Sequence, residues 1–161
     1  MPPTVLVVGV GNELRHDDAL GLEVVRRARG MAALRADPAI GFHEHEGEAL
    51  ALLGAWERAD AVIIADAVHG GGPAGARHRF DASSHPLPAR FEGSSSTHAI
   101  GVAEAIELGR VLGRLPRRLV VHGVTGSCFG AGRGLSAGLP EVADALARTV
   151  LDEALRLAGS R

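Results

Sequence analysis

Short apolar runs alternate with amphipathic segments along the whole chain. The runs that are rich in β-branched residues are too short to be buried helices and predict strands. They cover residues 4–10, 40–46, 61–65 and 119–124. The segments between and after them predict helices. These helices are expected at residues 18–30, 48–58, 97–113 and 140–157.

Strands that alternate with helices in this way are typical of an α/β protein. We therefore predict one three-layer domain over residues 1–161, with a mostly parallel twisted sheet and helices on both faces. Residues 76–81 alternate in polarity and are expected to form an edge strand. In this fold class, ligands bind at the carboxyl ends of the strands.

Composition narrows the choice of partners and compartment. The net charge is 17 − 19 = −2 with histidines neutral, which argues against binding nucleic acid through its phosphates. The sequence has no run of about 20 apolar residues and no secretory signal pattern, so we expect no membrane partner. The single cysteine, Cys128, cannot form an internal disulfide, which favours a reducing, cytoplasmic location.

Polar side chains gather where predicted strands give way to helices. Asn12, Asp17 and Asp18 follow the first strand, Asp66 follows the third, and His98 starts a later helix. Because such junctions share one edge of a parallel sheet, we expect Asp18, Asp66 and His98 to converge. Two carboxylates and an imidazole suit a divalent cation and leave positions open for water or substrate.

Other interpretations of the same residues stay open at this point. Gly9 and Gly11 suggest a dinucleotide turn, but the third small residue of that motif is replaced by Leu14, and an acidic pair would repel phosphate. Asp17 could cap a helix or act as a general base. Asn12 could hold a substrate carbonyl or stabilise its own turn.

These motifs, taken together, resemble the hydrogenase maturation endopeptidase family. The resemblance lies in order and spacing along most of the chain. The motifs are Val7-Val-Gly-Val-Gly-Asn12 with Asp17-Asp18 and Gly21, then Val62-Ile-Ile-Ala-Asp66, His98-Ala-Ile-Gly101 and Leu119–Val124. It implies a protease that removes a C-terminal extension from the large subunit of a nickel–iron hydrogenase after nickel insertion.

The resemblance also implies roles for individual residues. By position, Asp18, Asp66 and His98 would bind the metal, which is expected to be nickel, supplied with the substrate. Asp17 and Asp18 are the expected catalytic residues, and Asn12 is expected to contact the substrate. The expected partner is the hydrogenase large-subunit precursor, bound by a monomer of this protein. The alternative is a maturation factor that binds metal or precursor and cleaves nothing.

Overall fold

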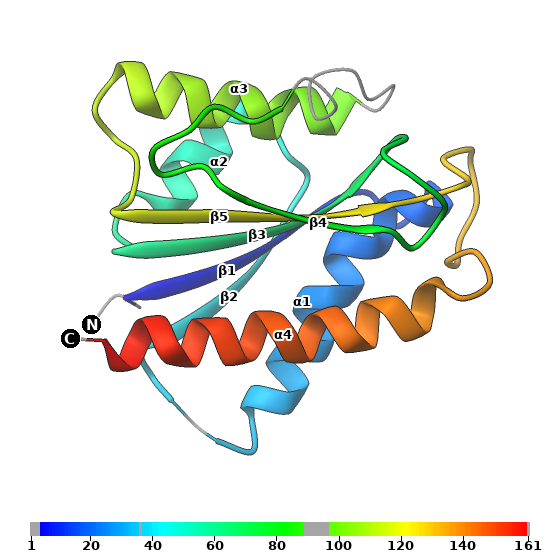
Figure 1. Cartoon of the computed structure of the whole chain (residues 1–161), viewed down its shortest axis with the longest axis horizontal. Coiled ribbons are helices and arrows are strands. Elements are labelled where there is room, and N and C mark those ends of the chain that lie inside the picture. The colour runs from blue at the N-terminus through cyan, green and yellow to red at the C-terminus, as the bar shows by residue number, and fades with distance from the viewer. Residues whose placement is uncertain (1–3, 36, 89–96, 161) are drawn as a thin grey trace.

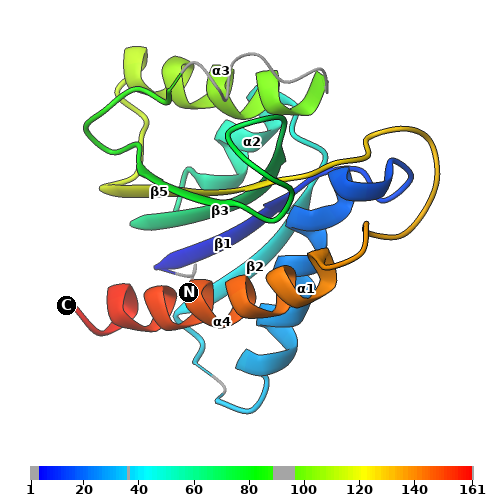
Figure 2. The same ribbon diagram turned by 45° about the vertical axis from the view of Figure 1, so that its right-hand side comes forward.

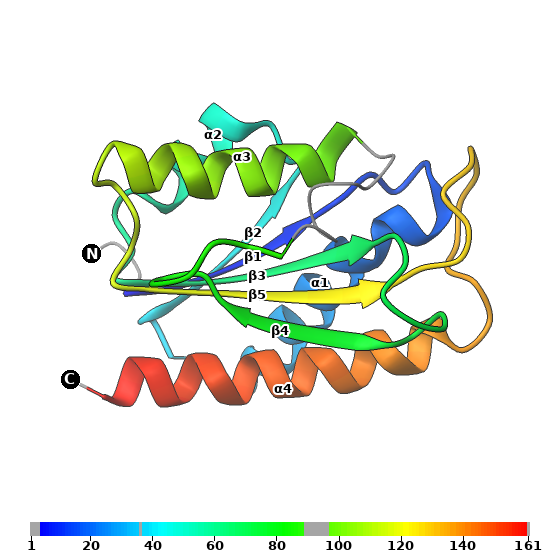
Figure 3. The ribbon, with the colours of Figure 1, turned by 45° about the horizontal axis from the view of Figure 1, so that its top comes forward.

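A five-stranded sheet forms the middle layer of the molecule (Figure 1). The computed structural model describes residues 4–35, 37–88 and 97–160. The strands are β1 (Val5–Val10), β2 (Ile40–His45), β3 (Ala61–Val68), β4 (Arg77–Asp81) and β5 (Arg118–Thr125). Their order across the sheet is β2-β1-β3-β5-β4. All neighbours pair in parallel except β4, which runs antiparallel to β5 at one edge (Figure 3).

Helices cover both faces of this sheet. They are the 3₁₀ helix η1 (His16–Ala19) and the α-helices α1 (Leu20–Ala32), α2 (Ala49–Trp56), α3 (Thr97–Val111) and α4 (Leu139–Gly159). Helices α1 and α4 lie side by side on one face, whereas α2 and α3 lie on the other (Figures 1 and 2). None of the described helices is long and apolar enough to cross a membrane.

The core consists of two apolar layers, one on each face of the sheet. In β1, Val5 and Val7 pack towards α1 and α4, and Leu6 and Val8 pack towards α2 and α3. Successive side chains of a strand point to opposite faces, so a strand covered on both sides must be apolar throughout. This explains why β1 and β3 appear in the sequence as unbroken apolar runs.

The predicted fold class is confirmed, with the edge strand where it was expected. The antiparallel direction of this strand, β4, was not predicted. Most boundaries differ by one or two residues, and two differences affect the site. The helix expected from residue 18 begins as the 3₁₀ turn η1, and α1 itself starts at Leu20. Strand β3 does not end before Asp66 but continues to Val68, because it pairs with the full length of β5.

Candidate active site

The carboxyl ends of β1 and β3 lie next to each other, and the chain leaves these two strands towards opposite faces of the sheet. After β1 it turns to α1 on one face, and the segment after β3 leads through β4 to α3 on the other face. Ligands of open α/β sheets bind at such switch points. The acidic residues of η1 and Asp66 of β3 both lie here.

Glycine at position 21 lets the start of α1 rest directly on the strand ends. A β-carbon on Gly21 would lie 2.3 Å from the carbonyl oxygens of both Val10 and Ala65, where no side chain fits. The same close approach brings η1 against β3. Gly21 therefore fixes the height at which Asp17 and Asp18 sit above the sheet.

Two carboxyl groups are buried together at this position. Asp18 is fully buried, and Asp66 is 2% exposed. Burial raises the pKa of Asp66 well above its ordinary value, and the negative charge of Asp18 raises it further. Two carboxyl groups buried this close together favour a shared proton or a cation between them. The structure thus brings together two of the three predicted metal ligands.

The third predicted ligand, His98, lies in the first turn of α3. Its side chain falls outside the part of the chain whose side chains are described. Further along α3, Gly101 packs closely against the turn before α2, since a β-carbon on Gly101 would lie 1.6 Å from the carbonyl oxygen of Gly47. Among the described residues, no three His, Cys, Asp or Glu side chains form a metal site, so the predicted triad stays a prediction.

Asp17 holds a loop that is more than 100 residues away in the sequence. Its buried carboxylate accepts hydrogen bonds from the backbone N–H groups of Ser127, Cys128 and Ser136 at 2.7–2.9 Å. The hydroxyls of Ser127 and Ser136 donate to it as well, at 3.3 and 2.8 Å. Burial opposes ionisation, but these hydrogen bonds outweigh it and lower the pKa of Asp17. The expectation of a helix cap was wrong, because neither η1 nor α1 has a side-chain cap.

The loop between β5 and α4 is therefore built onto the first motif (Figure 2). The N–H of His16 donates to the carbonyl of Gly132 at 2.8 Å, and the N–H of Gly132 donates to the carbonyl of Leu14 at 2.8 Å. The Nδ1 atom of His16 lies 3.0 Å from the carbonyl of Gly134. His16 has a φ of 46°, a left-handed conformation that is rare for a residue with a β-carbon. These contacts offset the cost of that conformation.

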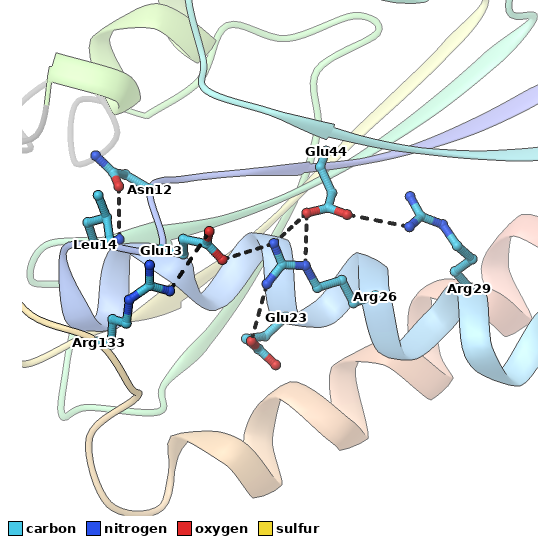
Figure 4. Close-up of polar contacts among 8 residues, drawn as sticks. All are labelled: Asn12, Glu13, Leu14, Glu23, Arg26, Arg29, Glu44 and Arg133. Carbon is cyan, nitrogen blue, oxygen red and sulfur yellow. Dashed lines mark hydrogen bonds and ion pairs between the residues drawn. The ribbon is translucent and has the colours of Figure 1, made fainter.

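Asn12 lies in the turn that follows β1, beside a cavity of about 320 Å³. Its side-chain oxygen accepts a hydrogen bond from the N–H of Leu14 at 2.9 Å, which stabilises the turn (Figure 4). The cavity lies between this turn and the end of β2, where Glu44, His45 and Glu46 line it. Asn12 is thus held in place where it borders open space.

A network of charged side chains also borders this cavity, and the sequence patterns did not predict it. Arg26 of α1 contacts Glu44 at 2.7 Å, Glu13 at 3.2 Å and Glu23 at 3.7 Å (Figure 4). Only the Glu23 contact, at helical i,i+3 spacing, has a signal in the sequence. The other two contacts join different elements and can be identified only from the three-dimensional structure.

Comparison with known proteins identifies the family. A family model described as hydrogenase maturation protease matches residues 47–153, about two thirds of the chain. The chain belongs to the hydrogenase maturation protease family. The resemblance inferred from the motifs is thus confirmed.

Relatives within this family are distant. The Hydrogenase 2 maturation protease of Escherichia coli is 29% identical over 120 residues, which cover 74% of this chain and 71% of that protein. The hydrogenase expression/formation protein HupD of Thiocapsa roseopersicina is 28% identical over 124 residues, which cover 76% of this chain. This alignment spans only 54% of the length of HupD.

Solved structures of the family share the fold. The hydrogenase maturating endopeptidase HybD of E. coli superposes with a TM-score of 0.73 at 27% identity, and the match covers 96% of this chain and 93% of HybD. A hydrogenase maturation protease of Thermococcus kodakarensis, at 24% identity and a TM-score of 0.67, supports the fold alone.

Proposed function

We propose that this protein is an endopeptidase that removes the C-terminal extension of a nickel–iron hydrogenase large-subunit precursor after nickel has been inserted. In this proposal, nickel arrives as part of the substrate, and Asp18, Asp66 and His98 recognise it. Family membership supports the substrate class. The observation that carries the proposal is the buried pair of Asp18 and Asp66 at the switch point between β1 and β3.

The electrostatics of this pair support metal recognition. Without a cation, burial and mutual repulsion keep a proton on the pair, as the raised pKa of Asp66 indicates. A divalent cation removes the repulsion and displaces that proton. Nickel accepts carboxylate oxygen and imidazole nitrogen, and His98 in the first turn of α3 would supply the nitrogen. A precursor without nickel would bring no cation to displace this proton and would not dock.

The geometry favours different roles for the two adjacent acids. Asp17 was expected to act as a general base if it did not cap the helix. Its five hydrogen bonds and lowered pKa make it a weak base and support a positioning role. The metal, held by Asp18, Asp66 and His98, would then supply the activation of the attacking water. Asn12 would contact the substrate through the part of its amide that the turn does not use.

The test is to incubate the protein with nickel-loaded and nickel-free precursor and to weigh the products. We expect loss of a C-terminal fragment only from the loaded precursor. Asp18→Ala should abolish nickel-dependent docking and cleavage, whereas Asp144→Ala, an exposed acid on α4, should change neither. Asp17→Ala should retain docking. Docking without cleavage by the wild-type protein would support the non-catalytic maturation factor instead.

A further inference from the structure

Two cavities adjoin along α1, and together they form what we call the α1 groove. The first, of about 320 Å³, borders Asn12 and Glu46, and the second, of about 310 Å³, extends to Pro140 at the start of α4. Glu13 and Arg133 line both cavities and so stand where they meet. Each cavity is large enough for a short stretch of peptide.

One of the two guanidinium groups in the first cavity is already fully engaged. Arg26 donates to Glu44 at 2.8 Å and to Glu13 at 3.2 Å, and it also lies 3.7 Å from Glu23. The hydrogen bond to Glu44 raises the pKa of Arg26. A ligand that drew Arg26 away would break the shortest ion pair of each of these carboxylates. They would be left with longer contacts to Arg29, Arg27 and Arg133, at 3.4, 3.8 and 4.0 Å. Arg26 therefore serves as part of the wall.

Arg133 is held quite differently. Its side chain is 71% exposed, and within the described residues its ion pair is a single contact with Glu13, at 4.0 Å (Figure 4). Glu13 would keep its closer contact with Arg26 if Arg133 moved to another anion. Exchange of partners by Arg133 thus leaves no charge stranded.

The backbone around Arg133 is nevertheless fixed. Gly132 on one side exchanges hydrogen bonds with Leu14 and His16, and Gly134 on the other side contacts the His16 ring. A β-carbon on Gly132 would lie 2.2 Å from the His16 ring, so this packing requires glycine. A guanidinium on a fixed backbone, with an exchangeable partner, is suited to capturing a carboxylate.

We propose that the α1 groove binds the C-terminal extension of the precursor and that Arg133 recognises a carboxylate on it. This inference rests on the proposed function. Every C-terminal extension ends in an α-carboxylate, and acidic side chains carry the same chemistry. The groove is well placed for this segment, because Gly11 and Asn12 line it and the N–H of Asn12 donates to the carbonyl of Asp18 at 3.3 Å.

The groove also contains a carboxylate that would favour a ligand of the opposite charge. Glu46 lines the first cavity, is exposed, and forms no ion pair within the described residues. If the groove bound a cationic segment, Glu46 would attract it and Arg133 would repel it. The two residues therefore distinguish the sign of the ligand.

The experiment measures binding of fluorescein-labelled peptides with the sequence of the precursor's extension to the full-length protein, by anisotropy at low salt. We expect Arg133→Gln to raise the Kd about two- to fivefold, the range of one exposed ion pair. Glu13→Gln, which removes the competing carboxylate, should lower the Kd. Arg148→Gln is the matched control, because Arg148 is 68% exposed and also pairs with one acid.

Further peptides identify the source of the carboxylate. If the α-carboxylate is the ligand, amidation of the peptide's C-terminus should abolish the effect of Arg133→Gln. If a side chain is the ligand, replacing the acidic residues by their amides should abolish it instead. An Arg133→Gln variant that binds like Arg148→Gln, or a loss of affinity with Glu46→Gln alone, overturns the proposal. Nickel-dependent cleavage by the wild-type protein would stand in either case, so the two proposals fail separately.

Discussion

Replacing Asp17 by alanine should destabilise the protein through a loop more than 100 residues away. The carboxylate accepts five hydrogen bonds, three of them from the backbone N–H groups of Ser127, Cys128 and Ser136. A hydrogen bond to a charged acceptor contributes about 1.5–3 kcal/mol. Ser127 and Cys128 are exposed, so water can replace part of this loss. About 1 kcal/mol for each backbone donor gives a total of about 3 kcal/mol.

This value corresponds to a decrease in Tm of about 6–12 °C for a chain of this length. Thermal unfolding followed by circular dichroism at pH 7 measures it. Asp144→Ala is the matched control, because Asp144 is 41% exposed and pairs with Arg148 one helical turn away. Such a pair contributes about 0.5 kcal/mol or less.

The pH dependence of the Asp17 contribution provides a second check. The pKa of Asp17 is lowered in the folded state, so its stabilising effect is present above the ordinary value of 3.8 and is lost as the pH falls through the folded-state pKa. The difference in Tm between the wild-type protein and Asp17→Asn should therefore become smaller in acid. Equal Tm values for Asp17→Ala and Asp144→Ala at pH 7 would refute the reasoning.

Four further substitutions should have measurable effects on stability. Burial opposes ionisation of Glu153, but hydrogen bonds from His122 and Arg79 outweigh it and lower the pKa of Glu153 from 4.5 to about 2. Glu153→Gln should therefore lower the free energy of unfolding, measured in urea at pH 7, by about 3 kcal/mol. This loss of stability should disappear as the pH drops from 4.5 towards 2. In α1, Gly21→Ala should lower stability by about 2 kcal/mol or more, whereas Gly30→Ala, which meets no atom within 4 Å, should raise it by about 0.5–1 kcal/mol. Asp66→Asn should raise the Tm at pH 7, because it removes a carboxyl group whose ionisation burial opposes, and the gain should vanish below pH 3.8, where this group is protonated in the folded and the unfolded state.

The fold was largely predictable because its signals are local. Unbroken apolar runs predicted β1 and β3 as strands covered on both faces, and alternating polarity predicted β4 as an edge. The proximity of Asp18 and Asp66 followed from the rule that parallel strands share one carboxyl edge, whereas their full burial was not predicted.

Contacts between distant segments could not be predicted in the same way. Nothing around Asp17 indicates that its partners lie at residues 127–136, because the hydrogen bonds depend on where the loop after β5 returns. The Arg26–Glu44 contact likewise joins α1 to β2 and has no spacing to reveal it. Sequence periodicity describes one element at a time, so links between loops appear only in three dimensions.

The long separation between Asp17 and its partners has a consequence for the newly made protein. Ser127 follows Asp17 by 110 positions, which a ribosome translates in about 5–20 s. During that interval β1, α1 and β2 can pair, but the carboxylate of Asp17 has no loop to hold. The loop between β5 and α4, which carries Arg133, therefore takes its place beside the candidate active site late in synthesis. A nascent chain that contacted a precursor before then would do so without this loop.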